Sequence, residues 1–254
     1  MIPPRCDFIA SPPGGHRWRT GAAGSAAVAG LVVALSGCDS PLQATGYFPL
    51  EAGHRWVYDQ ASEWDNNSAE RETLELSTLG EDRLASGPAM RRRSASGMDY
   101  WLRADGTGIF RVASKSDVQE EPQPDPAPRY VLKEPLAVGT QWQASTTAYL
   151  LRRRNEFPPE IRHTHAPVPM TYTIEAVGQK LATRAGQFDD CLRVRGQAVM
   201  KLFADPVVGW KELPLATTEW YCKGVGLVKL ERSEPASSTF LVGGTLRMEL
   251  VSWQ

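Results

Sequence analysis

The sequence predicts a mainly β protein, built as a curved antiparallel sheet or half-barrel that follows a short N-terminal helical segment. Apolar and polar residues alternate over 73–77, 171–176 and 245–250. This period of two is typical of antiparallel strands with one buried and one solvent-facing side. No long amphipathic helical pattern follows residue 38. Turn-forming pairs separate the alternating segments, namely Asp105-Gly106, Asp205-Pro206 and Gly243-Gly244.

Residues 1–37 have the order of regions expected of a cleaved secretory signal. Basic residues come first, followed by an apolar run of small residues from Gly21 to Leu35 and then by Ser36-Gly37. This run is shorter than the roughly 20 consecutive apolar residues of a membrane-spanning helix and contains several glycines. We therefore expect a lipoprotein signal helix over 1–37, with an ordinary secretory signal, a membrane anchor or a buried helix as alternatives.

The segment Leu35-Ser36-Gly37-Cys38 resembles the lipobox of bacterial lipoproteins, where a leucine and two small residues precede the cysteine that becomes the mature N-terminus. The resemblance implies that the Cys38 thiol receives a diacylglyceryl group, after which cleavage follows Gly37. A further acyl chain, such as palmitate, can then be added to the new amino group, and two or more chains anchor stably. We expect residues 38–45 to be a lipidated tether that holds a periplasm-facing protein in the cell envelope. Asp39 favours retention in the inner membrane, with the outer membrane as the alternative.

Composition sets broad limits on partners. The 254 residues carry a formal net charge of −1, and 22% of them are charged. Nothing indicates the clustered basic surface that a nucleic-acid partner requires. Once residues 1–37 are removed, the chain is long enough for one sizeable domain or two small ones.

Two cysteines remain after Cys6 is removed with the signal and Cys38 is lipidated. In an oxidising compartment, Cys191 and Cys222 are candidates for a disulfide. Alternation over 192–195 places Cys191 outward beside two arginines, a poor place for a free thiol. A disulfide that closes this loop contributes roughly 3–4 kcal/mol. Two separate structural cysteines are the alternative, and no C-x-x-C spacing indicates a redox or metal role.

A weak internal repeat suggests two related β units. The pattern Pro-Leu-x-x-Gly-x-x-Trp occurs at 49–56 and again at 135–142. We expect Gly53 and Gly139 to allow tight turns, and Trp56 and Trp142 to be inward-facing structural anchors. Chance recurrence of turn chemistry is the alternative. Downstream of each copy comes a tryptophan followed by a Gly-x-Gly pair, at Trp101 with Gly106 and Gly108, and at Trp220 with Gly224 and Gly226.

Between the two copies, residues 115–129 are acidic and rich in proline. Such composition favours an extended connector without a core of its own. The expected organisation is therefore a first β unit over 46–114, a linker over 115–129 and a second β unit over 130–254.

A family resemblance follows from three motifs. Tyr47-Phe48-Pro49-Leu50-x-x-Gly53-x-x-Trp56-x-Tyr58 resembles the opening of a group of uncharacterised bacterial lipoproteins. The segments 186–192 and 224–229, the latter reading Gly-Val-Gly-Leu-Val-Lys, are similar to their C-terminal strands. The resemblance implies no catalytic residue, because no activity is settled for the group. The curved half-barrels of lipoprotein carriers are a fold-level analogy.

Candidate chemical sites are few. His163-Thr164-His165, with Glu160, could form half of a metal site, but flanking prolines favour an exposed loop. The runs at 91–93 and 152–154 each hold three arginines, which could face anionic lipid or simply alternate across a solvated strand face. No G-x-S-x-G, H-E-x-x-H or P-loop pattern occurs. We therefore expect no catalytic residue, no metal and no cofactor.

The predicted function is that of a membrane-anchored, non-catalytic binding or assembly module of the envelope. Its expected partners are the membrane, through Cys38, and either another envelope protein or a lipid. The alternatives are a carrier that holds a lipid or acyl chain in an apolar cavity, and an envelope hydrolase. Eight tryptophans are more than a small core needs, so they could line such a cavity or belong to the core.

The anchor is directly testable with Cys38→Ala. Because only this thiol can accept the diacylglyceryl group, the variant should remain uncleaved or become soluble, as seen by detergent partitioning and intact mass. A variant that still partitions into detergent with the mass of a mature lipidated chain would contradict the anchor.

Overall fold

The computed structural model describes residues 43–154, 165–205, 207, 209–236 and 240–254. The predicted signal over 1–37, the lipidation site Cys38 and His163 lie outside these residues. From Gln43 onward the described chain belongs to one compact unit made almost entirely of antiparallel strands, which confirms the predicted mainly β, curved-sheet fold.

Twelve strands form a single antiparallel sheet. In sheet order they are β6 (Gln123–Lys133), β5 (Gly108–Lys115), β4 (Asp99–Asp105), β3 (Gly87–Ser94), β2 (Ala69–Leu84), β1 (Arg55–Trp64), β14 (Gly244–Trp253), β12 (Gly226–Glu234), β11 (Gly209–Cys222), β10 (Gly186–Asp205), β9 (Val168–Thr183) and β7 (Gln141–Thr146). Two short strands, β8 (Arg152–Arg153) and β13 (Leu241–Val242), pair with each other, and one short helix, α1 (Gln43–Tyr47), precedes β1.

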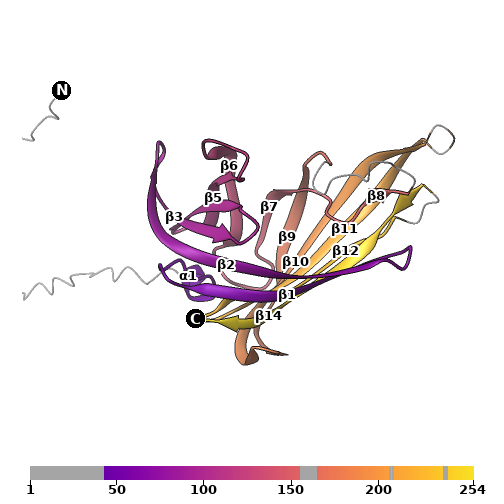
Figure 1. The fold of residues 1–254 in the computed structure, drawn as a ribbon. Coiled ribbons are helices and arrows are strands. Elements are labelled where there is room, and N and C mark those ends of the chain that lie inside the picture. The colour runs from indigo at the N-terminus through magenta and orange to yellow at the C-terminus, as the bar shows by residue number, and fades with distance from the viewer. Residues whose placement is uncertain (1–42, 155–164, 206, 208, 237–239) are drawn as a thin grey trace, which may run out of the picture. The chain divides into compact units, whose positions relative to one another are not determined.

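The sheet curves strongly, so that its two edge strands face each other. Figure 1 shows β3 to β6 on one side and β7 to β12 on the other, joined along the bottom by β1, β2 and β14. The edges β6 and β7 are not joined by a ladder, but the Arg129 Nε donates a 2.8 Å hydrogen bond to the Ser145 carbonyl across this seam. Prolines at 124, 126 and 128 lack the N–H groups that a further ladder would need.

The chain builds the sheet from two consecutive meanders of six strands, β1 to β6 and β7 to β14. They join side by side through β1 and β14. The boundary differs from the expected linker over 115–129, because β6 begins at Gln123 and pairs with β5. Arg111 also donates two hydrogen bonds, of 2.6 and 2.8 Å, to the carboxylate of Asp125. The second half of the proline-rich segment is therefore an edge strand of the first meander.

The two Pro-Leu-x-x-Gly-x-x-Trp copies occupy equivalent places in these meanders. Gly53 and Gly139 have φ of 93° and 92°, which favours glycine, and each precedes the first strand of its meander. Each glycine N–H donates a 2.9 Å hydrogen bond to the next strand, at Thr78 or Ile174. The register then aligns the two anchors, since Trp56 pairs with Leu76, and Trp142 pairs with Tyr172.

The second landmark of the repeat is a β-bulge at the same place in both halves. The register shifts directly after Trp101 on β4 and directly after Trp220 on β11. The hairpins then turn into Gly108 and Gly226, whose φ values are 136° and 100°. These shared bulges and turns support a duplicated strand-rich unit rather than chance recurrence.

Both anchor tryptophans are buried. Trp56 is 2% exposed and donates a 2.6 Å hydrogen bond from Nε1 to the Val225 carbonyl. Trp142 is 5% exposed and stacks on Tyr172 with ring centroids 5.6 Å apart. The main core fills the end of the curved sheet nearest α1, where both halves contribute side chains, including Leu102, Ile109, Leu132, Ile174, Leu192 and Val194.

The arginine run at 91–93 does not simply lie on a solvated face. Arg91 and Arg93 pair with Asp99, but Arg92 is buried and lies over the rings of Trp56 and Phe48, at 4.2 and 4.4 Å. Burial lowers the pKa of Arg92 to about 10, so it remains a cation at neutral pH. Cation–π contacts and a 2.6 Å hydrogen bond to the Pro49 carbonyl stabilise it there.

The predicted disulfide between Cys191 and Cys222 is present, with Cα atoms 4.0 Å apart on neighbouring strands. Cys191 lies on the face of β10 opposite Leu192 and Val194, as expected, but this face is covered here and the cysteine is fully buried. The ends of β9 and β10 belong to a second hydrophobic cluster, in which Phe188 and Leu181 pack near both cysteines. The sheet is thus covered on both faces at this point.

We predict that Trp56→Ala and Trp142→Ala each lower the free energy of unfolding by about 3–5 kcal/mol, because each truncation leaves a large buried void. Urea denaturation of the purified variants measures this. Trp210→Ala is the matched control, since Trp210 is 63% exposed and should change stability little. If either buried variant unfolds at the same urea concentration as wild type, that tryptophan is not a structural anchor.

Candidate functional site

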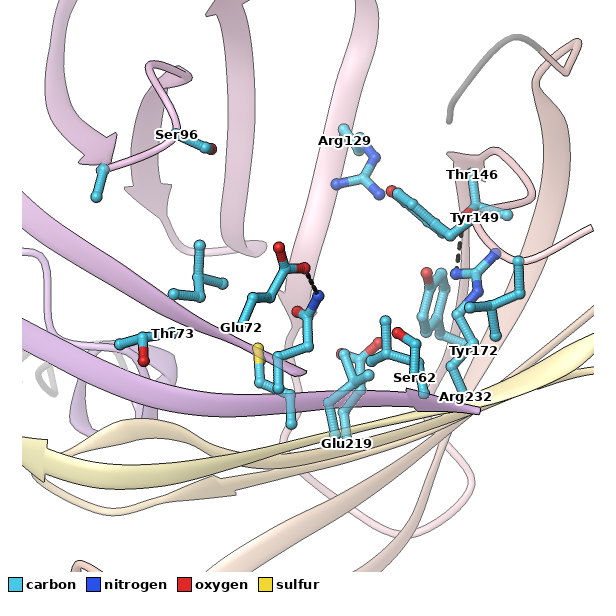
Figure 2. A pocket seen from close by; sticks show the side chains of 17 residues that line it. Ser62, Glu72, Thr73, Ser96, Arg129, Thr146, Tyr149, Tyr172, Glu219 and Arg232 are labelled. Carbon is cyan, nitrogen blue, oxygen red and sulfur yellow. Dashed lines mark hydrogen bonds between the residues drawn. The ribbon is translucent and has the colours of Figure 1, made fainter. Parts of the chain in front are cut away.

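A pocket of about 590 Å³ opens on the concave side of the sheet, beyond the end of the main core. Its floor consists of inward-facing residues in cross-strand rows, because alternate residues of each strand share a face. One row runs Gln60–Met248–Leu230–Glu219 across β1, β14, β12 and β11. The next row runs Ser62–Leu246–Arg232. Figure 2 shows Arg129, Tyr149 and Thr146 on the other side of the pocket from Ser62 and Glu219.

One wall is the loop over 147–151, which a buried carboxylate holds in place. Glu234 is fully buried and accepts hydrogen bonds of 2.8–3.2 Å from the backbone N–H groups of Tyr149, Leu150 and Leu151. Consecutive N–H groups that converge in this way form a concave anion site. Here the protein's own carboxylate fills it and fixes Tyr149 and Leu150 against the pocket.

Arg232 balances the charge of Glu234, and each of its three side-chain nitrogens has a protein partner. Its Nε lies 2.5 Å from Glu234, and its two terminal nitrogens donate to the Thr146 hydroxyl and the Thr147 carbonyl. Its guanidinium also lies 4.4 Å from the centre of the Tyr149 ring. Arg232 therefore supports the wall, and its charge is balanced by Glu234 before any ligand binds.

Arg129 has a different environment, although it lines the same pocket. Within the described ranges, the Nε of Arg129 is its one hydrogen-bonding atom, and it donates to Ser145 across the seam between β6 and β7. Among the residues that the structure describes, no carboxylate forms an ion pair with it. Its two terminal nitrogens are thus available on the pocket side.

Glu219 contributes a desolvated carboxyl group to the floor. The residue keeps some exposure through the pocket, but protein atoms surround its carboxyl group, and this burial raises its pKa. Hydrogen bonds from Tyr221 (2.5 Å) and Thr217, together with Arg129 and Arg232, partly oppose the shift. Burial and the charge of Glu219 also raise the pKa of Tyr172.

The residues singled out in the sequence lie elsewhere. Trp56 and Trp142 are core, and none of the tryptophans in the described chain lines the pocket. His165 lies with its Nε2 2.8 Å from the Leu151 carbonyl. In the described ranges no cluster of three metal-ligating side chains occurs.

Sequence reasoning missed Arg129, Glu219, Arg232 and Glu234. A local signal existed for two of them, because Val228, Leu230, Arg232 and Glu234 alternate along one inward face of β12.

None of the helices in the described parts of the chain has the length and apolar character needed to cross a membrane.

Glu219 yields a pH-dependent prediction. A carboxyl whose folded pKa is raised stabilises the fold most below its unfolded pKa, about 4.3, and loses that contribution as pH rises. Glu219→Gln should therefore unfold with a higher free energy than wild type at pH 7.5, and the difference should shrink towards pH 4. Denaturant titrations across this range measure it, with the exposed Glu212→Gln on the same strand as control. A difference that does not vary with pH would argue against a desolvated Glu219.

No protein-family model and no curated protein matches this chain. Two solved structures are similar to it. One is a candidate lipoprotein from Parabacteroides distasonis, 14% identical, with a TM-score of 0.40 over 82% of this chain and 98% of that one. The other is a candidate exported protein with a YmcC-like fold from Bacteroides fragilis, 12% identical, with a TM-score of 0.36 over 80% and 96%. Likenesses this weak carry no argument about function.

Proposed function

We propose that this chain is a lipoprotein of the bacterial cell envelope, anchored through Cys38 and facing the periplasm, that works as a non-catalytic binding module. The concave pocket is its ligand site. The anchor rests on the lipobox resemblance of residues 35–38, and the binding role rests on the pocket.

The observation that carries the binding role is the construction of the pocket. Its volume of about 590 Å³ falls within the range of sites for small ligands. Its lining combines an apolar patch on the floor, at Leu230, Leu246 and Met248, with many polar side chains that can orient a ligand. The wall over 147–151 is held by Glu234, so the shape is preformed, which reduces the entropic cost of binding.

Two other roles have some support. A carrier of a lipid or acyl chain is favoured by the apolar part of the floor, although no tryptophan lines it. An assembly role is favoured by exposed apolar residues near the end of the β10–β11 hairpin, namely Val199, Phe203, Val207 and Trp210.

An envelope hydrolase is the least supported reading. The pocket holds two carboxylates, Glu72 and Glu219, but each already accepts hydrogen bonds from neighbouring protein groups. Gln60 donates to Glu72, while Tyr221 and Thr217 donate to Glu219.

Filling the pocket tests the proposal. Leu246→Trp adds a large side chain on the pocket floor, while Thr245→Trp adds the same side chain at an exposed position one residue earlier, on the opposite face of β14. Each full-length protein is purified from envelopes, and small molecules that co-purify are identified by mass spectrometry. We expect wild type and Thr245→Trp to carry the same bound molecule and Leu246→Trp to lack it. Equal recovery from both variants, or no bound molecule in wild type, would contradict the pocket as ligand site.

A further inference from the structure

We propose that the pocket takes an anionic amphiphile, whose carboxylate or phosphate group pairs with Arg129 and whose aliphatic body lies along Leu230, Leu246 and Met248. This inference rests on the proposed binding function and names the ligand class of the same site.

The two arginines in the pocket differ in how many of their side-chain nitrogens bind protein atoms. Arg232 is neutralised by Glu234, and all three of its nitrogens have protein partners. Arg129 uses only Nε, towards Ser145. A guanidinium with two unused terminal nitrogens presents the planar fork that binds carboxylate or phosphate with two parallel hydrogen bonds.

Neither carboxylate of the pocket lining, Glu72 or Glu219, forms a hydrogen bond or an ion pair with Arg129 among the described residues. Glu72 accepts from Gln60, and Glu219 accepts from Tyr221 and Thr217. Arg129 acts on Glu219 through its charge and lowers the pKa of that carboxyl, but among the described residues no hydrogen bond or ion pair joins the two side chains. The polar part of the site therefore keeps one cation that a ligand can pair with.

Apolar side chains on the pocket floor, at Leu230, Leu246 and Met248, form a strip that can contact an aliphatic chain. Leu230 on β12 pairs directly with Met248 on β14, and Leu246 precedes Met248 by two residues on the same face. On β1 the lining residues Gln60 and Ser62 are polar, and Leu74 on β2 adds a further apolar side chain beyond them. From β12 to β2 there are three inter-strand spacings, roughly 14 Å along the sheet. A short aliphatic chain fits such a strip, whereas a compact polar ion does not use it.

Arg129 lies at the edge of the sheet. It lies on β6 at the seam where the two edge strands face each other without a ladder. Figure 2 shows Arg129 across the pocket from Ser62 and Glu219, so a ligand whose headgroup pairs with Arg129 can place its aliphatic body on the floor.

The test uses the full-length lipoprotein in phosphatidylcholine nanodiscs, with empty nanodiscs subtracted, and isothermal titration of four short probes. These are octanoate, octyl phosphate, octan-1-ol and octylamine. We expect at least one anionic probe to bind about tenfold or more tightly than octan-1-ol, as one charge-assisted contact allows. The carboxylate and phosphate arms show which headgroup the site prefers.

Variants assign the preference to Arg129. Arg129→Gln should bring the affinity for the anionic probe close to that of octan-1-ol, and Arg129→Lys should keep part of the difference. Arg247→Gln, on the exposed outer face of β14, is the matched control and should behave as wild type.

The outcomes distinguish failure of the inference from failure of the proposed function. Tighter binding of octylamine or octan-1-ol, a preference that survives Arg129→Gln, or no binding of either anionic probe overturns the anionic amphiphile. Titrations that Leu246→Trp leaves unchanged show instead that the pocket is not the binding site, which overturns both.

Discussion

The carboxylate of Glu234 accepts hydrogen bonds from the backbone N–H groups of residues 149–151. Arg232, on the same strand, balances its charge. Removing one partner of a buried pair costs about 3–5 kcal/mol, because the other charge is left without compensation. The loop over 147–151 has no ladder of its own in the large sheet, so this pair determines where its side chains lie. The wall of the pocket, the position of Tyr149 and the separation of the pocket from Trp64 all depend on it, since Leu150 also accepts a hydrogen bond from the Trp64 indole.

The duplicated scaffold shows how one backbone plan supports two different interiors. The registers Leu76 with Ser94 and Tyr172 with Gly196 make Arg92 the counterpart of Val194. In the second half this position is an ordinary core valine, whereas in the first half it is a buried cation enclosed by aromatic rings. The turn, register and bulge are alike because they depend on backbone geometry. The side chains differ because each half meets different neighbours, and the pocket takes residues from both.

Much of the fold could be predicted from the sequence, because strands with one wet face leave a local pattern of period two. The turns at Gly53 and Gly139 and the anchors Trp56 and Trp142 could also be predicted, because short local motifs mark them. The place of Cys191 could not be predicted, since its burial comes from a hairpin end that folds against the outer face. The burial of Arg92 could not be predicted for the same reason. Alternation places Arg92 on the opposite face from Arg91 and Arg93, but it does not indicate which face is covered. The pocket depends on register across nine segments, so no single motif marks Arg129 or Glu219.

The prolines of β6 also affect how separate copies of this protein meet. A strand edge with free N–H and C=O groups is a template onto which another chain can add, and such edges promote aggregation. Pro124, Pro126 and Pro128 remove donors along the outer edge of β6, and Asp125 between them is held by Arg111. An edge that offers few donors disfavours edge-to-edge pairing and so favours keeping separate copies of the chain apart.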